Sequence, residues 1–231
     1  TWFVNEAAQD ELVARVGGVK IKDLDLIGGM AVYLPVKAEA TLAKQAGVLR
    51  IDDDVIVEAL AKPRNTQSVE TLPWGVDRID ADLVWDSTTA DLIKVAIIDT
   101  GIDVKHPDLI DNLKGGVSAV WYTTSYNDDN GHGTHVAGIA AAVDNTIGVI
   151  GVGPQIDLYA VKVLDRRGSG YLSDVIEGLD WAIANGIQVV NMSLGTSANV
   201  LSFQEAVQRV NAVGIVQVAA AGNGGAVIYP A

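Results

Sequence analysis

From about Asp91 to its end, the chain alternates short apolar segments with segments of helical periodicity. The apolar segments are 93–98, 157–163, 186–193 and 214–221, and the helical segments are 133–143, 171–185 and 202–213. Short apolar runs bounded by turn residues are typical of strands that are buried on both faces. Because such strands alternate with helices, the sequence predicts an α/β fold with a doubly wound, mostly parallel sheet covered by helices on both sides.

The first sixty residues have a different pattern. Helical spacing extends over 6–16 and 38–46, and strand-like runs occupy 19–26, 30–35 and 48–51, with 2–4 as a possible first strand. This order predicts a small α+β unit of the split βαβ, ferredoxin-like type. The polar segment 61–73 contains two prolines and is typical of a linker or an extended arm. We therefore expect three parts, which are residues 1–60, the linker 61–73 and the α/β part 74–231.

Charge and composition exclude several classes of partner. The chain has 29 acidic and 16 basic residues, a net charge of −13. This balance disfavours nucleic acid and anionic membranes, and it suits solubility outside the cell or cation binding. There is no cysteine, so disulfides are excluded, and no apolar run approaches the roughly 18 residues of a membrane span. Because the chain begins with Thr1 and stops soon after a strand-like run, we expect it to be a piece of a longer polypeptide.

An aspartate and a histidine stand at positions suited to proton transfer. Asp99 follows the segment 93–98, and His132 lies between two glycines at the start of the helical segment 133–143. Catalytic groups gather at the C-terminal ends of parallel strands. An aspartate there could orient the imidazole and stabilise its protonated form, as in a nucleophilic triad. Taken singly, Asp99 could instead cap a turn, and His132 could simply start a helix.

Two other kinds of site are compatible with single motifs. His132 and His135 are three residues apart and His106 is the third histidine, but a zinc site would need carboxylates, and the His-Glu-x-x-His spacing is absent. The turn Gly168–Gly170 follows a predicted strand and precedes a helix, as in a nucleotide-binding loop. Ser173 stands where that motif has its third glycine, which weakens this interpretation.

Four motifs follow one another along the second part of the chain. They are Asp99-Thr-Gly-Ile-Asp with His106-Pro-Asp-Leu109, Asn130-Gly-His-Gly-Thr-His-Val-Ala-Gly138, Asn191-Met-Ser-Leu-Gly195 and Ala220-Ala-Gly-Asn223. In this order and at this spacing they resemble the subtilisin family of serine proteases, and the resemblance covers residues 67–231. The first sixty residues resemble the inhibitory propeptide that accompanies such proteases.

The resemblance implies catalytic roles for three residues. Asp99 resembles the aspartate of the triad, His132 the general base, and Asn223 the side chain that stabilises the oxyanion. The family's serine motif, of the Gly-Thr-Ser-Met-Ala type, is absent from these 231 residues. Ser193 is no substitute, because it belongs to a motif that resembles a substrate-binding strand. We therefore expect this piece to be inactive alone.

The parent polypeptide is expected to be a secreted serine endopeptidase, made as a self-inhibited zymogen. The alternative is a catalytically dead relative that keeps the peptide groove as a binding or folding-assistant module. The implied partners are peptide or protein substrates and the chain's own propeptide, and we expect a monomer.

The same resemblance implies a groove for an extended peptide. Two segments would flank the peptide and pair with it as added strands. They are Gly168-Ser169-Gly170 and Ser193-Leu194-Gly195. Gly222 would border the pocket for the residue before the cut, leaving space for a large apolar side chain. Residues 55–60 resemble the propeptide tail that lies in this groove like a product, which implies self-cleavage between Leu60 and Ala61. The acidic residues 52–54 would then meet helix N-termini of the protease.

A loop after the helical segment 133–143 resembles a calcium-binding loop of the family. The implied ligands are the side chains of Gln67, Asp108 and Asn145 and the backbone carbonyls of Val143, Ile147 and Val149. Hard oxygen ligands of this mix suit Ca²⁺. On the residues alone, a plain surface turn is the alternative.

Overall fold

The computed structural model describes residues 6–60 and 69–231. The predicted strand at 2–4 therefore lies outside the described residues, as do Ala61 and Gln67. The N-terminal part contains α1 (Glu6–Arg15), β1 (Val19–Leu24), the 3-10 helix η1 (Asp25–Ile27), β2 (Gly29–Tyr33) and α2 (Glu39–Leu42). It is followed by β3 (Ile56–Ala59), α3 (Trp74–Arg78) and the 3-10 helix η2 (Asp82–Val84). The remaining elements are β4 (Lys94–Asp99), β5 (Leu113–Ser118), α4 (His132–Ala141), β6 (Asp157–Lys162), β7 (Ser169–Tyr171), α5 (Leu172–Ala184), β8 (Val189–Met192), β9 (Leu194–Gly195), α6 (Leu201–Ala212) and β10 (Val216–Ala219).

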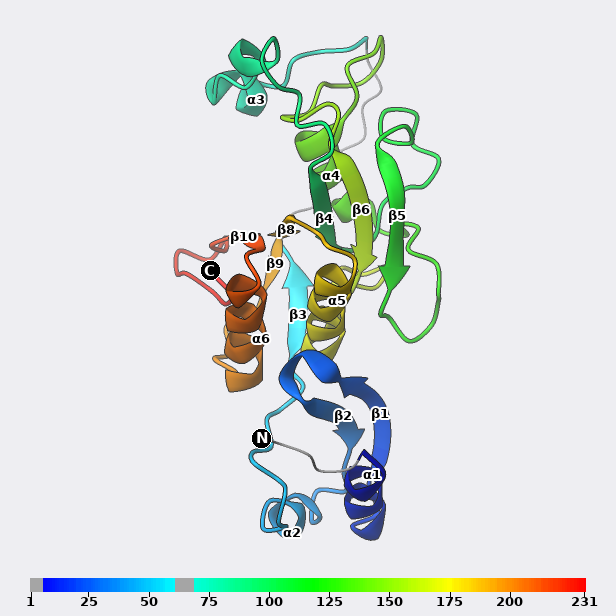
Figure 1. Ribbon diagram of the computed structural model, residues 1–231, viewed down its shortest axis with the longest axis vertical. Coiled ribbons are helices and arrows are strands. Elements are labelled where there is room, and N and C mark those ends of the chain that lie inside the picture. The colour runs from blue at the N-terminus through cyan, green and yellow to red at the C-terminus, as the bar shows by residue number, and fades with distance from the viewer. Residues whose placement is uncertain (1–5, 61–68) are drawn as a thin grey trace.

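The centre of the molecule is a five-stranded parallel sheet in the order β10-β8-β4-β6-β5 (Figure 1). The predicted doubly wound α/β fold is thus confirmed, and the strands and helices expected after residue 91 are present with bounds shifted by a few residues. The middle strand β4 pairs with β6 so that Asp99 lies opposite Lys162. The C-terminal ends of the strands meet at one edge, which is where Asp99 lies.

Helices cover both faces of this sheet. Side chains of β4 alternate between two buried clusters, with Ala96 and Ile98 packed beneath α5 and α6, and Val95 and Ile97 packed against α4. Ile97 and Ile98 are both fully buried. A side chain of this size contributes roughly 2 kcal/mol when it is buried completely. Packing in the two cores fixes the position of β4 within the sheet, and therefore the position of Asp99 at the C-terminal end of β4.

The edge strand β5 has no counterpart among the predicted strands. Its sequence contains Gly115 and Gly116, and glycine weakens a strand because it has no side chain to pack. The structure gives the reason for the second glycine. A Cβ at Gly116 would lie 2.2 Å from the carbonyl oxygen of Ala160 in β6, so only glycine permits this close approach.

The N-terminal part contains the expected α1 and an antiparallel hairpin of β1 and β2, in which Val19 lies opposite Tyr33. Two expectations were wrong. Residues 48–51 form no strand, and α2 covers only Glu39–Leu42 of the predicted 38–46. The Arg50 guanidinium instead contacts Asp52 at 2.7 Å and Glu205 of α6 at 3.2 Å. These contacts direct the chain along α6, away from the hairpin.

The N-terminal part packs onto the outer surface of α5 and α6, at the lower end of the molecule in Figure 1. Leu24 and Leu26 belong to the same buried cluster as those helices. Lys22 crosses the interface, with its Nζ 2.5 Å from both Asp174 and Glu177 of α5. Burial would lower the pKa of Lys22, but the hydrogen bonds and charges of the two carboxylates outweigh it and raise the pKa. No helix among the described residues is long and apolar enough to cross a membrane.

Candidate active site

Asp99 and His132 form a buried pair at the C-terminal edge of the sheet. β4 ends at Asp99 and α4 begins at His132. The His132 Nδ1 lies 2.7 Å from one carboxylate oxygen of Asp99 and 2.8 Å from the other. Asp99 is fully buried and His132 is 1% exposed. Such short contacts fix the tautomer, because a proton on Nδ1 facing the carboxylate leaves Nε2 free to accept one.

Gly133 allows this close approach of α4 to β4. A Cβ at Gly133 would lie 2.1 Å from the carbonyl oxygen of Gly101 and 3.2 Å from the Asp99 side chain. The amide of Gly133 donates instead to the Thr100 hydroxyl at 2.9 Å. Any side chain here would force the helix, and the imidazole with it, away from Asp99. Steric exclusion of any side chain therefore explains why a glycine follows His132.

Asp128, for which no role was predicted, organises the loop before α4. Its Oδ1 accepts hydrogen bonds from the amides of Asn130 and Gly131, both at 2.9 Å, and from the Thr100 hydroxyl at 2.9 Å. Its Oδ2 accepts from the amide and the hydroxyl of Thr134, at 3.0 and 2.6 Å. Aspartates commonly accept from amides two or three residues ahead at turns and helix starts. The sequence Asp128–Gly131 fits this pattern, and it could have predicted the role of Asp128 in the loop.

The environment of His132 favours its protonated form. Burial opposes the charge and would lower the pKa, but the hydrogen bond and charge of Asp99, with a further contribution from the charge of Asp128, outweigh it. The pKa of His132 is therefore raised above its ordinary value of 6.5. A base of raised pKa accepts a proton more readily in a reaction.

We expect the Asp99→Asn variant to lower the pKa of His132, because the charge that stabilises the imidazolium is then lost. NMR titration of the histidine ring signals measures this directly. The exposed His135 of α4 serves as an internal control, since its ring signals should be unaffected by the substitution. An unchanged pKa of His132 in the variant would contradict the pairing.

The same pair predicts a pH dependence of stability. Because the folded pKa of His132 lies above the unfolded value of about 6.5, the stabilisation from the pair is fully present below pH 6.5 and is lost as the pH rises through the folded pKa. The stability difference between the intact chain and Asp99→Asn should therefore shrink with increasing pH. Urea unfolding at several pH values measures it.

A strand of the N-terminal part occupies a groove beside this pair. β3 lies between β7 and β9 in an antiparallel three-stranded sheet, with Glu58 opposite both Ser169 and Gly195. The amide of Ala59 donates to the Gly168 carbonyl at 2.8 Å, and that of Leu60 donates to the Ser193 carbonyl at 3.2 Å. The predicted segments 168–170 and 193–195 thus do flank an extended strand, with Val57 opposite Gly170 and Ala59 opposite Leu194.

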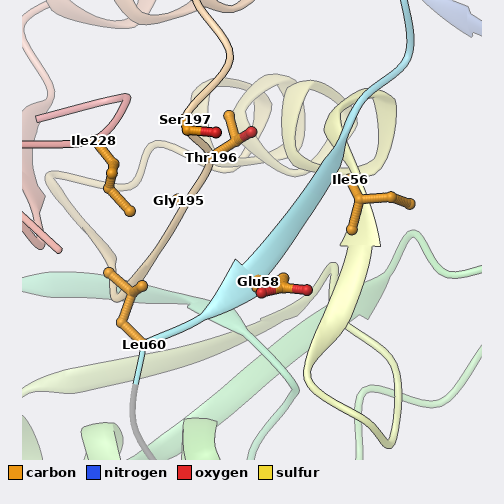
Figure 2. A pocket seen from close by; sticks show the side chains of 7 residues that line it. All are labelled: Ile56, Glu58, Leu60, Gly195, Thr196, Ser197 and Ile228. Carbon is orange, nitrogen blue, oxygen red and sulfur yellow. The ribbon is translucent and has the colours of Figure 1, made fainter. Parts of the chain in front are cut away.

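The last residue of this segment, Leu60, meets two further predicted features. Its carbonyl oxygen accepts a hydrogen bond from the Asn223 side-chain amide. Its side chain lines a pocket of about 270 Å³ together with Gly195 and Ile228, as Figure 2 shows. Gly222, which has φ +104°, is not among the residues that line this pocket, but a Cβ there would lie 3.2 Å from Ile228. Gly222 therefore lies beside Ile228, which lines the pocket, and not on the wall of the pocket itself.

Acidic residues before β3 meet two helix N-termini, as expected. Asp54 accepts from the Ser173 amide at 2.9 Å and from the Ser173 hydroxyl at 2.7 Å, at the start of α5. Asp52 accepts from the Ser202 amide at 3.0 Å, at the start of α6. Carboxylates at these positions satisfy free amides and interact favourably with the helix dipole. They hold the segment that leads into the groove.

The loop predicted to bind calcium closes around Asp108, which is 3% exposed. Asp108 accepts from the Asn145 side-chain amide at 2.8 Å and from the Val149 amide at 3.0 Å. Gly148 has φ +68°, and a Cβ there would lie 2.2 Å from the Asp108 carboxylate. The loop therefore brings the Asp108 carboxylate and the Asn145 side chain together.

Backbone carbonyls complete the set of oxygens in this loop. Those of Thr146 and Gly148 accept from the amides of Glu70 and Thr71. By contrast, the carbonyls of Val143, Ile147 and Val149 accept no hydrogen bond from any described residue. Across residues 6–60 and 69–231, no cluster of three or more His, Cys, Asp or Glu side chains suits a metal. A cation here would depend on the three carbonyls, one carboxylate and one amide oxygen.

A buried aspartate–histidine pair at the C-terminal edge of a parallel sheet is an arrangement of hydrolases that use a nucleophilic triad. The Subtilase family (peptidase S8) model matches residues 91–231. The chain belongs to the subtilase family, a family of serine endopeptidases.

Curated relatives extend the similarity into the N-terminal part. The thermostable alkaline protease of Halalkalibacterium halodurans is 42% identical over 212 residues, which are 90% of this chain and 57% of that protein. Subtilisin E of Bacillus subtilis is 40% identical over 224 residues, or 96% of this chain and 56% of its own length. M-protease of Shouchella clausii is 46% identical over 169 residues, or 72% and 44%. The chain thus spans about half the length of the curated relatives it matches.

Proposed function

We propose that the polypeptide containing this chain is a serine endopeptidase and that residues 1–60 are its inhibitory propeptide. The observation that carries the proposal is the placement of Leu60, whose carbonyl accepts from Asn223 while its amide donates to Ser193. A Cβ at Gly168 would lie 3.3 Å from Ala59 and 3.6 Å from the Asn130 side chain, two residues before His132. β3, its flanking segment and the histidine loop therefore meet at one place.

In the proposed reaction, His132 is the general base. The Nε2 atom takes the proton from a serine that lies outside these 231 residues, while the serine oxygen attacks the peptide carbonyl. Asp99 holds the imidazole and stabilises its protonated form. Asn223 donates to the oxyanion that develops on the carbonyl, and His132 then gives its proton to the leaving amine. Without the serine, the 231-residue chain is inactive by itself.

The propeptide role follows from the same contacts. β3 pairs on both sides as a substrate would, and Asn223 already contacts the carbonyl of Leu60. The self-cleaved bond is therefore Leu60–Ala61, with the Leu60 side chain in the pocket for the residue before the cut. Asp52, Asp54 and Lys22 keep this product-like segment attached after cleavage.

The function is tested by a fluorophosphonate probe, which labels activated serines, on the full-length polypeptide. We expect labelling of one serine on the C-terminal side of residue 231, mapped by mass spectrometry. Absence of labelling, together with retained binding of an extended peptide, would favour the alternative of a non-catalytic peptide-binding module. The observation that favours this alternative is that these 231 residues contain no serine motif of the family.

We also propose a calcium ion in the loop around Asp108. The Asp108 carboxylate, the Asn145 amide oxygen and the carbonyls of Val143, Ile147 and Val149 would hold it, and Gln67 is the predicted sixth ligand. The support is the set of three carbonyls without described hydrogen-bond donors beside a buried carboxylate. Bound calcium would brace the loop that follows α4 and would neutralise part of the net charge of −13.

A chelator is expected to lower the melting temperature of the intact chain, because a ligand bound only to the folded state stabilises it by mass action. At a calcium concentration 100 times its Kd, the stabilisation is about 2.7 kcal/mol. The Asp108→Asn variant should melt at a temperature that no longer depends on the chelator, whereas the exposed Asp111→Asn should behave like the intact chain. A melting curve of the intact chain that the chelator leaves unchanged would contradict the site.

The parent is proposed to act outside the cell as a monomer. The location is supported by composition, since a strongly acidic chain suits solubility outside the cell, and the monomer is what the resemblance implies.

A further inference from the structure

Lys162 is a fully buried lysine at the end of β6, beside the proposed catalytic pair. Its Nζ donates to the Thr100 carbonyl at 2.6 Å, to the Asp129 carboxylate at 2.7 Å and to the Leu164 carbonyl at 3.0 Å. A lysine ammonium has three donors, so all of them are used. Burying a cation is costly unless it is paired and hydrogen-bonded, and here both conditions are met.

The three acceptors lie on three separate segments of the site. Thr100 directly follows Asp99, and Asp129 comes three residues before His132. Leu164 lies between β6 and the Gly168 segment that contacts β3, and its amide donates to the Asp99 carbonyl at 3.1 Å. One buried ammonium therefore joins the segments that carry the orienting aspartate Asp99, the proposed base His132 and one side of the peptide groove.

Tyr122 closes the outer side of this cluster. Its hydroxyl donates to the second oxygen of Asp129 at 2.9 Å, and its ring centroid lies 5.9 Å from the Lys162 Nζ. Burial, followed by the hydrogen bond and charge of Asp129, raises the pKa of Tyr122 to about 12. The hydroxyl thus stays protonated and holds Asp129 toward Lys162.

We propose that Lys162 is a positioning residue, which through Asp129 and the Thr100 carbonyl holds the His132 loop against Asp99. Its effect on hydrolysis rests on the function proposed above. The positioning itself needs no serine, because it is read from the imidazole of His132 in the 231-residue chain.

An electrostatic role of Lys162 and a positioning role of Lys162 predict opposite changes in the pKa of His132. Removing a nearby cation without any movement would favour the imidazolium and raise the pKa of His132. Loosening the contact with Asp99 would weaken the interaction that raises this pKa and would therefore lower it. A lysine that only supports the fold would leave the pKa unchanged while lowering stability. The direction of the shift thus separates the three roles.

The test replaces Lys162 with methionine, which has a similar shape and no charge, and titrates the histidines by NMR. We expect the pKa of His132 to fall and the signal of the proton between Nδ1 and Asp99 to weaken. The matched control is Lys94→Met, which removes a lysine from the opposite end of β4, where its Nζ donates to the Asn185 carbonyl at 3.3 Å and lies 6.0 Å from the Tyr159 ring centroid. An unchanged or increased pKa of His132 in Lys162→Met would overturn the proposal.

A second pair of variants covers the case in which Lys162→Met does not fold. Asp129→Asn and Asp129→Ala both remove the same charge, but asparagine keeps an oxygen that can accept from Lys162. Positioning predicts a larger fall of the His132 pKa in the alanine variant, and equal falls in both would overturn it. In the full-length polypeptide, Asp129→Ala should also lower kcat by a larger factor than the factor by which it changes KM. If that polypeptide were inactive, the titrations would still decide the proposal, so the two failures are distinguishable.

Discussion

Replacing His132 with alanine in the full-length polypeptide is expected to reduce peptide hydrolysis about a million-fold, the magnitude known for loss of the triad histidine in subtilisin. The reason is the buried contact with Asp99 at 2.7 Å, which orients the imidazole so that its Nε2 can take a proton. Hydrolysis of a chromogenic peptide measures the loss, and labelling by a fluorophosphonate should disappear with it.

The matched control is His135→Ala, one turn further along α4. His135 is exposed and makes no described side-chain hydrogen bond, so hydrolysis should stay close to that of the unmodified polypeptide. Persistent labelling of the His132 variant would mean that another group activates the serine. It would then remove the central assignment of the proposed function.

The second large effect is expected at Asn223. Replacing it with alanine should lower kcat by about 10²–10³-fold, or roughly 3–4 kcal/mol, the effect of removing this kind of donor in subtilisin. The side-chain amide already contacts the Leu60 carbonyl, which marks the position where negative charge would develop. Steady-state kinetics should show the loss mainly in kcat, because the interaction strengthens as the oxyanion forms.

Asn223→Asp gives a sharper comparison, since it keeps the shape and places a carboxylate beside the developing charge. Its loss should exceed that of the alanine variant. The exposed Asn211→Ala in α6 is a control for a general effect of removing an asparagine. Equal kcat values for Asn223→Ala and the unmodified polypeptide would show that the donor lies elsewhere.

Periodicity alone was sufficient for most of the α/β part. The apolar runs that became β4, β6, β8 and β10 alternate with helices, which leaves few arrangements other than a parallel sheet. Burial on both faces holds for the middle strand β4, whereas the edge strand β10 exposes Val216 and Val218. β5 escaped prediction because its two glycines lack strand propensity, and Gly116 is required by a close approach to Ala160 that only the fold creates. The strand expected at 48–51 failed for the reverse reason, because contacts of Arg50 with the nearby Asp52 and with Glu205 of α6 override a local preference.

The active site shows the same contrast between features that the sequence predicts and features that depend on tertiary contacts. Asp99 and His132 were predicted from their places in the chain, whereas Asn223 and the flanking segments were predicted only from the resemblance. Asp128 could have been found from its spacing to the following amides. Lys162 could not, because a lysine at the end of a strand predicts a solvated side chain, and its three acceptors come from segments that only the fold brings together.

The pairing of β3 has a consequence for which peptides could take its place. The amides of Ala59 and Leu60 both donate to carbonyls of the groove. Proline has no amide hydrogen, so a peptide with proline at either position would lose a hydrogen bond and leave a groove carbonyl without a partner. A peptide with proline at either position should therefore bind this groove more weakly, by about 1 kcal/mol for each lost hydrogen bond. Part of the selection among peptides would then depend on the backbone and not on the side chains.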